Sequence, residues 1–91
     1  MTGRHPAVAG TFYPDNKKVL LKQLDSLFSG VSEKQESEMV VSPHAGYVYS
    51  GKSAAHAIAS LKRFQRFIIL GPSHYPVGPK FSVVINGSWE T

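Results

Sequence analysis

Two short apolar runs, each followed by a turn that contains proline, limit what this chain can fold into more than any other feature. The first run spans residues 39–42 ahead of Pro43, and the second spans residues 67–70 ahead of Pro72. Residues 53–64 lie between the runs and place small residues on one helical face. A strand, a helix of about a dozen residues and a second strand are the elements of a right-handed parallel βαβ unit. We therefore expect an α/β fold with a βαβ-containing sheet flanked by helices.

Another amphipathic helix is expected ahead of this unit, over residues 15–30. Its apolar residues recur at positions i, i+4, i+7 and i+8, with Asp15 placed to cap the start and Gly30 placed to end the helix. Residues 81–86 are a third candidate strand, which Gly87 would end in a turn. The apolar face of the helix is formed by Leu20, Leu24, Leu27 and Phe28.

These elements are few for a parallel sheet, which needs cover on both of its faces. A chain of 91 residues is enough for one small domain and too short for two, and it has no cysteine with which to form a disulfide. We expect residues 1–91 to be the N-terminal portion of a single larger α/β domain whose C-terminal portion is absent. An apolar surface after Phe81 should then be exposed, or be covered by a homo-oligomer or by the remainder of the same protein.

Positive charge is scattered along the chain. The net charge of +4 is not gathered into a basic helix with interleaved aromatic residues, and this pattern predicts a solvated surface and no nucleic-acid partner. No apolar run approaches the ~18 residues that a membrane-spanning helix requires, and the N-terminal residues lack the apolar core of a signal peptide. We therefore expect no membrane association and a cytoplasmic location.

Residues 46–53, GYVYSGKS, match the phosphate-loop pattern G-x-x-x-x-G-K-[ST]. Nucleotide binding requires a compact loop whose backbone amides surround the phosphates. Tyr47, Val48 and Tyr49 are bulky for such a loop, and the run at 67–70 is not followed by the aspartate that holds magnesium in such enzymes. Nucleotide binding by this P-loop sequence is the least favoured of the functions considered, and neither ATP nor GTP is expected to bind there.

A histidine follows each apolar run, His44 after the first and His74 after the second. Ligands of parallel α/β sheets bind beyond the carboxyl ends of the strands, so adjacent strands would place both imidazoles in one crevice. Neutral imidazoles suit a divalent transition metal. The other interpretation is that both are loop histidines with hydrogen-bonding roles, and the residues alone leave both open. A metal site also requires a third ligand, and the nearest acidic side chains, Glu90, Asp15 and Asp25, do not follow a strand.

Aromatic residues crowd the same turns, notably Phe12, Tyr13 and Tyr47. They either pack against one another or line a pocket in which a ligand stacks on them. The start of the helix near residues 51–53 would add a positive dipole end, which favours anions. Together these features suggest an alternative function, a non-enzymatic pocket for a peptide or a small anionic ligand. His56, inside that helix, is expected to be a packing or surface residue.

Four motifs resemble the Memo family, which includes mediator of cell motility in animals and the Memo component of the AmmeMemoRadiSam system in microbes. They follow one another in order over almost the whole chain and at the spacing of the family. The motifs are R-x-P-A-V-A-G-T-F-Y-P from Arg4 to Pro14, P-H-A-G-Y-x-Y-S-G from Pro43 to Gly51, A-A-H-A from Ala54 to Ala57, and I-L-G-P-S-H from Ile69 to His74.

This resemblance implies a fold like that of class III extradiol ring-cleaving dioxygenases, an α/β domain with a His-lined crevice. It implies binding of iron or copper, with His44 and His74 as the two early metal-site histidines and Phe12 at the wall of the pocket. Animal members of the family are linked to recognition of phosphotyrosine-type peptides. The resemblance places a later histidine and the third metal ligand, a cysteine or another residue, in sequence that this chain does not contain. We therefore expect metal-dependent redox or dioxygenase-related chemistry in the intact protein and an inactive isolated chain, with the metal, the substrate and the reaction left open.

Overall fold

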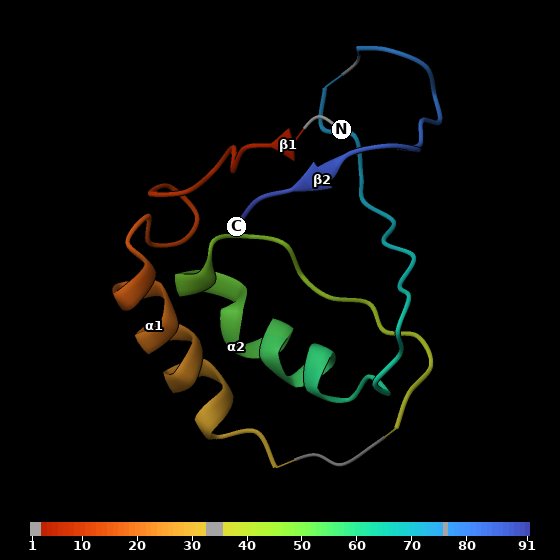
Figure 1. Ribbon diagram of the computed structural model, residues 1–91. Coiled ribbons are helices and arrows are strands. Elements are labelled where there is room, and N and C mark those ends of the chain that lie inside the picture. Colours follow the sequence, from red (N-terminus) through yellow and green to blue (C-terminus); the bar gives the residue numbers. More distant parts are fainter. Residues whose placement is uncertain (1–2, 33–35, 76) are drawn as a thin grey trace. The chain divides into compact units, whose positions relative to one another are not determined.

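The structure, a computed structural model, describes residues 3–32, 36–75 and 77–91, and within them it contains two helices and two short strands (Figure 1). In chain order these are β1 (Gly3–Arg4), α1 (Lys17–Ser29), α2 (Tyr47–Ala59) and β2 (Ser88–Trp89). The chain divides into two compact units. The helical unit is Ala7–Arg63, and the terminal unit is Met1–Pro6 together with Phe64–Thr91.

Helix α1 forms where the apolar spacing predicts it, and Asn16 caps its start. The side-chain oxygen of Asn16 accepts hydrogen bonds from the amides of Lys18 at 3.0 Å and Val19 at 3.2 Å. Such a cap satisfies amides that have no partner inside the helix. The expectation that Asp15 is the cap is wrong by one residue, because the Asn16 side chain occupies both amides. Gly30 ends the helix, as expected.

Helix α2 begins at Tyr47, well before the predicted start at Ser53. Gly46 is its N-cap residue, and the Tyr47 amide donates a hydrogen bond of 2.8 Å to the carbonyl of Phe12. This bond provides a partner for an amide that the helix itself cannot satisfy. The start of α2 therefore depends on a residue far away in the sequence, which local spacing cannot reveal.

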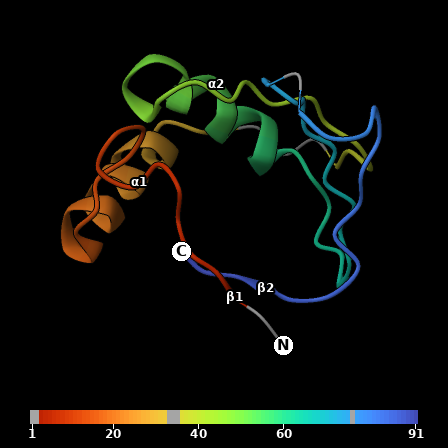
Figure 2. The same ribbon diagram turned by 90° about the horizontal axis from the view of Figure 1, so that it is seen from above.

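The two helices pack side by side through small residues of α2 (Figures 1 and 2). Gly51 and Ala55, one turn apart, are the buried residues of α2, and Ala55 is only 2% exposed. A Cβ atom at Gly51 would lie 2.8 Å from Leu27 Cδ1 of α1, closer than two carbon atoms normally approach. The missing side chain at Gly51 lets α1 come close. The small face predicted for this helix is present, but it packs on a helix and not on a sheet.

A short backbone contact closes the helical unit after α2. The Ser37 amide donates to the carbonyl of Ser60 at 2.7 Å, and the Lys62 amide donates to the carbonyl of Ser37 at 2.9 Å. These bonds form an isolated parallel bridge between Ser37 and Leu61. The Lys62 ammonium also lies 3.4 Å from a Glu38 carboxylate oxygen. Parallel pairing thus exists beside α2, but it does not extend into the predicted strand at 39–42.

The three predicted strands, at residues 39–42, 67–70 and 81–86, are not formed, because the structure describes all three segments as irregular chain. Nearly all of their apolar side chains are exposed. A buried strand persists only where a neighbouring strand pairs with its backbone and other elements cover its faces, and these segments have neither. Among the residues that the structure describes, the βαβ unit is therefore not formed. The coarser prediction is confirmed, since helices occur together with a parallel strand pair.

The terminal unit holds that strand pair. Gly3 lies opposite Ser88, and Arg4 lies opposite Trp89, in parallel register. The guanidinium carbon of Arg4 is 4.6 Å from the centre of the Trp89 ring, a cation–π distance. Two further bonds extend the contact: the Glu90 amide donates to the Arg4 carbonyl at 2.9 Å, and His5 Nδ1 lies 2.6 Å from a Glu90 carboxylate oxygen. We call residues 3–5 and 88–90 the terminal pair.

Candidate functional site

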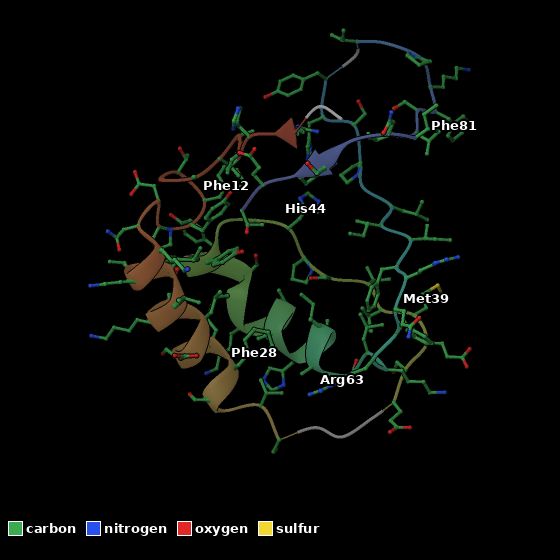
Figure 3. The ribbon with its side chains drawn as sticks, viewed as in Figure 1. Phe12, Phe28, Met39, His44, Arg63 and Phe81 are labelled. Atoms are coloured by element: carbon green, nitrogen blue, oxygen red, sulfur yellow. The ribbon has the colours of Figure 1, made fainter. Side chains whose placement is uncertain are left out.

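A cavity of about 300 Å³ lies inside the helical unit, between α1, α2 and the segments that precede them. Three aromatic residues predicted to form a ligand pocket, Phe12, Tyr13 and Tyr47, all line it. His44 lines it as well. Phe12 and His44 are labelled in Figure 3. These four residues therefore border one cavity, and binding of a ligand in it stays a prediction.

A tight turn over residues 8–13 places the first two aromatic residues. The amides of Thr11 and Phe12 donate to the Val8 carbonyl at 3.1 and 2.9 Å, and the Gly10 amide donates to the Tyr13 carbonyl at 2.7 Å. Gly10 has a φ angle of 82°, which glycine adopts without steric cost and most other residues avoid. The turn directs Tyr13 towards Tyr47, and the centres of these two rings are 5.4 Å apart with a tilt of 32°. An aromatic pair at this distance is stabilising.

His44 is held by the segment that leads into α2. It follows Pro43, whose ring restricts the backbone, and it precedes the Gly46 cap by two positions. The hydroxyl of Ser50, one turn into α2, donates to the carbonyl of Ala45 at 3.0 Å and so fastens the chain beside His44 to the helix. The His44 side chain is exposed while still lining the cavity, so it is accessible both to solvent and to a bound molecule.

The sequence analysis missed Ser50 as part of this site. Its hydroxyl lies within reach of two carbonyls, those of Ala45 and Gly46. Serine bonded to the carbonyl four residues earlier is a known local pattern, so the spacing from Gly46 contained a usable signal. Apolar side chains form the rest of the cavity wall: Val8, Leu24, Leu27, Phe28, Ala54, Ala55 and Ile58. A mainly apolar cavity with a few polar groups at one end suits a small organic molecule that carries one polar group.

His74 lies in the terminal unit, on an irregular loop. The loop encloses an open depression of about 480 Å³, lined among others by Ser73, His74, Tyr75 and Lys80. The Ser73 hydroxyl donates to the Tyr75 carbonyl at 3.0 Å, which shapes the loop locally. His44 and His74 thus belong to different units, and their sharing of one crevice stays a prediction.

The described residues contain no group of three histidine, cysteine, aspartate or glutamate side chains placed to hold one metal ion. Glu90, one of the acidic residues considered as a third ligand, is paired with His5. Asp15 lies beside Gly10, where a Cβ atom would be 3.2 Å from the carboxylate oxygen. A complete metal site built on His44 and His74 would therefore need at least one ligand besides those that the described residues bring together.

The P-loop sequence at residues 46–53 does not form a loop. Tyr47 to Ser53 are helical, and Gly51 is buried against α1. Amides inside a helix are bonded to its own carbonyls and cannot surround a phosphate. This also corrects the anion site expected near residues 51–53, because the amino end of α2 lies at Gly46 and Tyr47 instead. His56 lies inside α2, as expected.

Across the described residues, neither helix is long and apolar enough to cross a membrane.

Comparison with known proteins gives a consistent result. Residues 4–91 match the family described as Memo-like protein. A MEMO1 family protein of Aquifex aeolicus is 41% identical over 92 residues, which cover 100% of this chain and 34% of that protein. A MEMO1 family protein of Thermoplasma volcanium is 45% identical over 91 residues, which cover 97% of this chain and 34% of that protein. The chain therefore spans about a third of the length of these relatives, and no solved structure matches it.

Proposed function

We propose, from the premise that this chain belongs to the Memo-like protein family, that it provides the histidine-bearing wall of a metal-dependent ligand site. In this proposal His44 and His74 supply two imidazole ligands to iron or copper. Phe12, Tyr13 and Tyr47 form the apolar wall against which the organic ligand lies. The observation that supports the proposal most directly is the cavity that gathers the three aromatic residues with His44.

The two histidines have the right chemistry for this role. Imidazole nitrogen is a suitable ligand for both iron and copper. A bound metal of this kind supplies Lewis-acid or redox chemistry at an open coordination position. Two protein ligands hold an ion less tightly than three, so the isolated chain is proposed to bind metal weakly and to show no turnover. Redox or dioxygenase-related activity is proposed for an intact Memo-like protein only.

The aromatic wall determines which ligand fits. The Tyr13 and Tyr47 rings are fixed against each other, and the Tyr47 amide is bonded to the Phe12 carbonyl. These contacts organise the wall before a ligand arrives, which lowers the entropic cost of binding. A cavity of about 300 Å³ is at the lower end of the range for small-molecule pockets. The substrate class proposed is thus a small molecule, or one side chain of a peptide, with an aromatic or otherwise apolar body.

Metal titration of the 91-residue chain tests the proposal. Copper(II) binding, followed by calorimetry and by the electron paramagnetic resonance of the ion, should weaken at least about tenfold in both His44→Ala and His74→Ala, because loss even of a group that supports a ligand costs that much. The matched control is His56→Ala, which removes an imidazole from the middle of α2 and should leave the affinity unchanged.

The double variant distinguishes one shared ion from two separate ones. If His44 and His74 hold the same ion, the unchanged chain binds one copper ion, each single variant binds it more weakly, and the double variant binds it more weakly still because both imidazole ligands are lost. Independent losses from two sites would contradict the shared site, and full affinity in both single variants would contradict the proposal as a whole.

A second candidate function is a non-enzymatic pocket for a small anionic ligand or peptide. The observation that favours it is the amino end of α2 beside the cavity, where no side chain caps Gly46 and the first turn has no acidic residue. Helix amino ends attract anions. Benzoate, an aromatic anion, separates the two functions: binding that persists when a chelator has removed all metal favours the pocket alone, and binding that requires metal favours the first proposal.

A further inference from the structure

The chain has two asparagines, Asn16 and Asn86, and only Asn86 is followed by glycine. The side-chain amide of asparagine is open to attack by the backbone nitrogen of the next residue. A glycine in the next position leaves that nitrogen accessible, because it has no Cβ atom to obstruct the approach. The pair Asn86–Gly87 therefore places an electrophilic amide beside an unobstructed backbone nitrogen.

The surroundings of this pair leave both reacting groups accessible. Asn86 is exposed and lies in a bend outside the helices and strands, after the irregular segment 81–85. Among the described residues, no hydrogen bond holds the Asn86 side chain or the Gly87 amide. Ring closure between them requires rotation about the bonds of Asn86, and a bend of irregular chain permits that rotation more readily than a helix does.

Asn16 has the opposite environment. It is followed by Lys17, the first residue of α1, and its side-chain oxygen accepts hydrogen bonds from the amides of Lys18 and Val19. The side chain is thus held at the start of the helix, and the next residue has a Cβ atom. Intramolecular attack requires the reacting atoms to approach in the right geometry, which these contacts oppose. Asn16 therefore provides an internal control for the reactivity of Asn86.

We propose that Asn86–Gly87 is a site of spontaneous deamidation, and that the isoaspartate formed there opens the terminal pair. The Gly87 nitrogen loses its proton and bonds to the side-chain carbonyl carbon of Asn86, whose amide nitrogen leaves as ammonia. The product is a succinimide ring, which water then opens. Opening at the original backbone carbonyl gives isoaspartate, with the Asn86 β-carbon in the main chain, and opening at the other carbonyl gives aspartate.

Isoaspartate lengthens the main chain by one carbon directly ahead of β2. That strand is only two residues long, and it pairs with β1 through Ser88 opposite Gly3 and Trp89 opposite Arg4 (Figure 1). A main-chain insertion disrupts a strand ladder locally, and so short a ladder has few bonds to resist it. The Trp89 ring should then leave the Arg4 guanidinium, which lies 4.6 Å away. This inference does not depend on the metal-dependent function proposed above.

Ageing of the 91-residue chain at neutral and at mildly alkaline pH tests the modification. Trypsin separates the two asparagines into the peptides 5–17 and 81–91. The mass gain of amide-to-acid conversion should appear in 81–91 at least about tenfold faster than in 5–17, because only Asn86 can reach the geometry of attack. The rate should rise with pH, since the electron pair of a planar amide nitrogen is delocalised and the nitrogen attacks only after losing its proton. Electron-transfer fragmentation distinguishes isoaspartate from aspartate, and an unaged sample corrects for modification during digestion.

Tryptophan emission tests the effect on the terminal pair, because Trp89 is the only tryptophan. In the aged chain the urea midpoint of the emission change should fall as the isoaspartate content rises. Asn86→Gln should stay unmodified, since its longer side chain closes a ring less readily, and its midpoint should not move on ageing. Freshly prepared Asn86→Asp adds the charge without lengthening the main chain, and this matched control should keep the midpoint of the fresh chain. Gly87 is left unchanged, because its φ angle of 125° would strain any other residue.

Four results would overturn the proposal. One is a mass gain at Asn86 that is no faster than at Asn16. Another is a product that contains aspartate and no isoaspartate. The third is an aged chain that contains isoaspartate and keeps the emission midpoint of the fresh chain. The fourth is a shift that fresh Asn86→Asp reproduces in full, which would assign the effect to charge and not to the lengthened main chain.

Discussion

At the residue scale, Asn16 and Asp15 have nearly the same shape, yet the side chain of Asn16 is the one that caps α1. Both residue types are good caps, so composition does not separate them. Which residue caps the helix depends on which Cα lies at the helix boundary. A side chain one position earlier points away from the first amides of the helix. Sequence spacing therefore predicts that a cap exists here more securely than it predicts which residue provides it.

Replacing this cap tests its contribution. Asn16→Ala should lower the free energy of unfolding by about 1 kcal/mol, because the amides of Lys18 and Val19 lose their acceptor. The measurement is urea unfolding followed by far-ultraviolet circular dichroism. Asn16→Asp keeps an acceptor oxygen and is the control, expected to change stability little. Equal stability of Asn16→Ala and the original chain would mean that water replaces the cap at no cost.

At the element scale, the close approach of α1 and α2 depends on the absence of a side chain at Gly51. A Cβ atom there would already lie 2.8 Å from Leu27 Cδ1, and a branched side chain would push further into α1. The neighbouring Lys52 is exposed on the same helix. The glycine and lysine that make residues 46–53 look like a P-loop thus have separate roles: one permits helix packing, and the other lies on the surface.

Gly51→Val should destabilise the helical unit by about 1–3 kcal/mol, the usual cost of overpacking, which exceeds the few tenths of a kcal/mol that a helix gains from losing a glycine. Lys52→Ala is the matched control and should leave stability within about 0.5 kcal/mol. Urea unfolding measures both. If the clash between the new side chain at position 51 and Leu27 is the cause, Leu27→Ala should lower the free energy of unfolding less in the Gly51→Val background than in the original chain. Fully additive losses of stability would contradict this explanation.

The comparison of sequence and structure also belongs to the element scale. The position of α1 follows from its own spacing of Leu20, Leu24 and Leu27, which is local information. The start of α2 does not follow from local spacing, because it depends on the hydrogen bond that the Tyr47 amide donates to the Phe12 carbonyl. The strands expected at 39–42 and 67–70 depend even more on distant partners, and without them the apolar runs stay irregular.

The candidate site follows the same division. Phe12, Tyr13, His44 and Tyr47 could be associated from their motifs, and they line one cavity. The cavity-wall residues of α1 could not be assigned to this site from the sequence, because their position depends on how the two helices pack. The proposed pairing of His44 with His74 depends on an arrangement of separate units and remains the prediction that the copper titration tests.

At the scale of the whole molecule, little apolar surface is buried. Among the described residues Ala55 is the only buried hydrophobic residue. The helical unit is held by the contact between α1 and α2, by the turn docked on α2, and by the bridge between Ser37 and Leu61. A chain of this size is marginally stable even with a complete core.

The terminal pair has a consequence for the time course of folding. His5 and Glu90 are 85 positions apart, and closing a loop costs about 0.6 kcal/mol more for each doubling of its length. Helices form from local contacts in about a microsecond. The terminal pair should therefore be the last contact to form and the first to open, since its residues are exposed and its bonds are few.

Trp89, the only tryptophan, reports this contact alone, because the Arg4 guanidinium lies over its ring. Tryptophan emission should change at a lower urea concentration than the circular dichroism of the helices. Arg4→Ala should move the emission change to a still lower urea concentration and leave the urea midpoint of the helical transition unchanged. Coincident transitions would show that opening of the terminal pair and loss of the helices are a single cooperative event. An earlier tryptophan transition would have a kinetic meaning: residues 3–5 and 88–90 would separate and rejoin many times during the lifetime of the folded helices. A molecule that must capture either segment in the open form would then not need to wait for the helices to unfold.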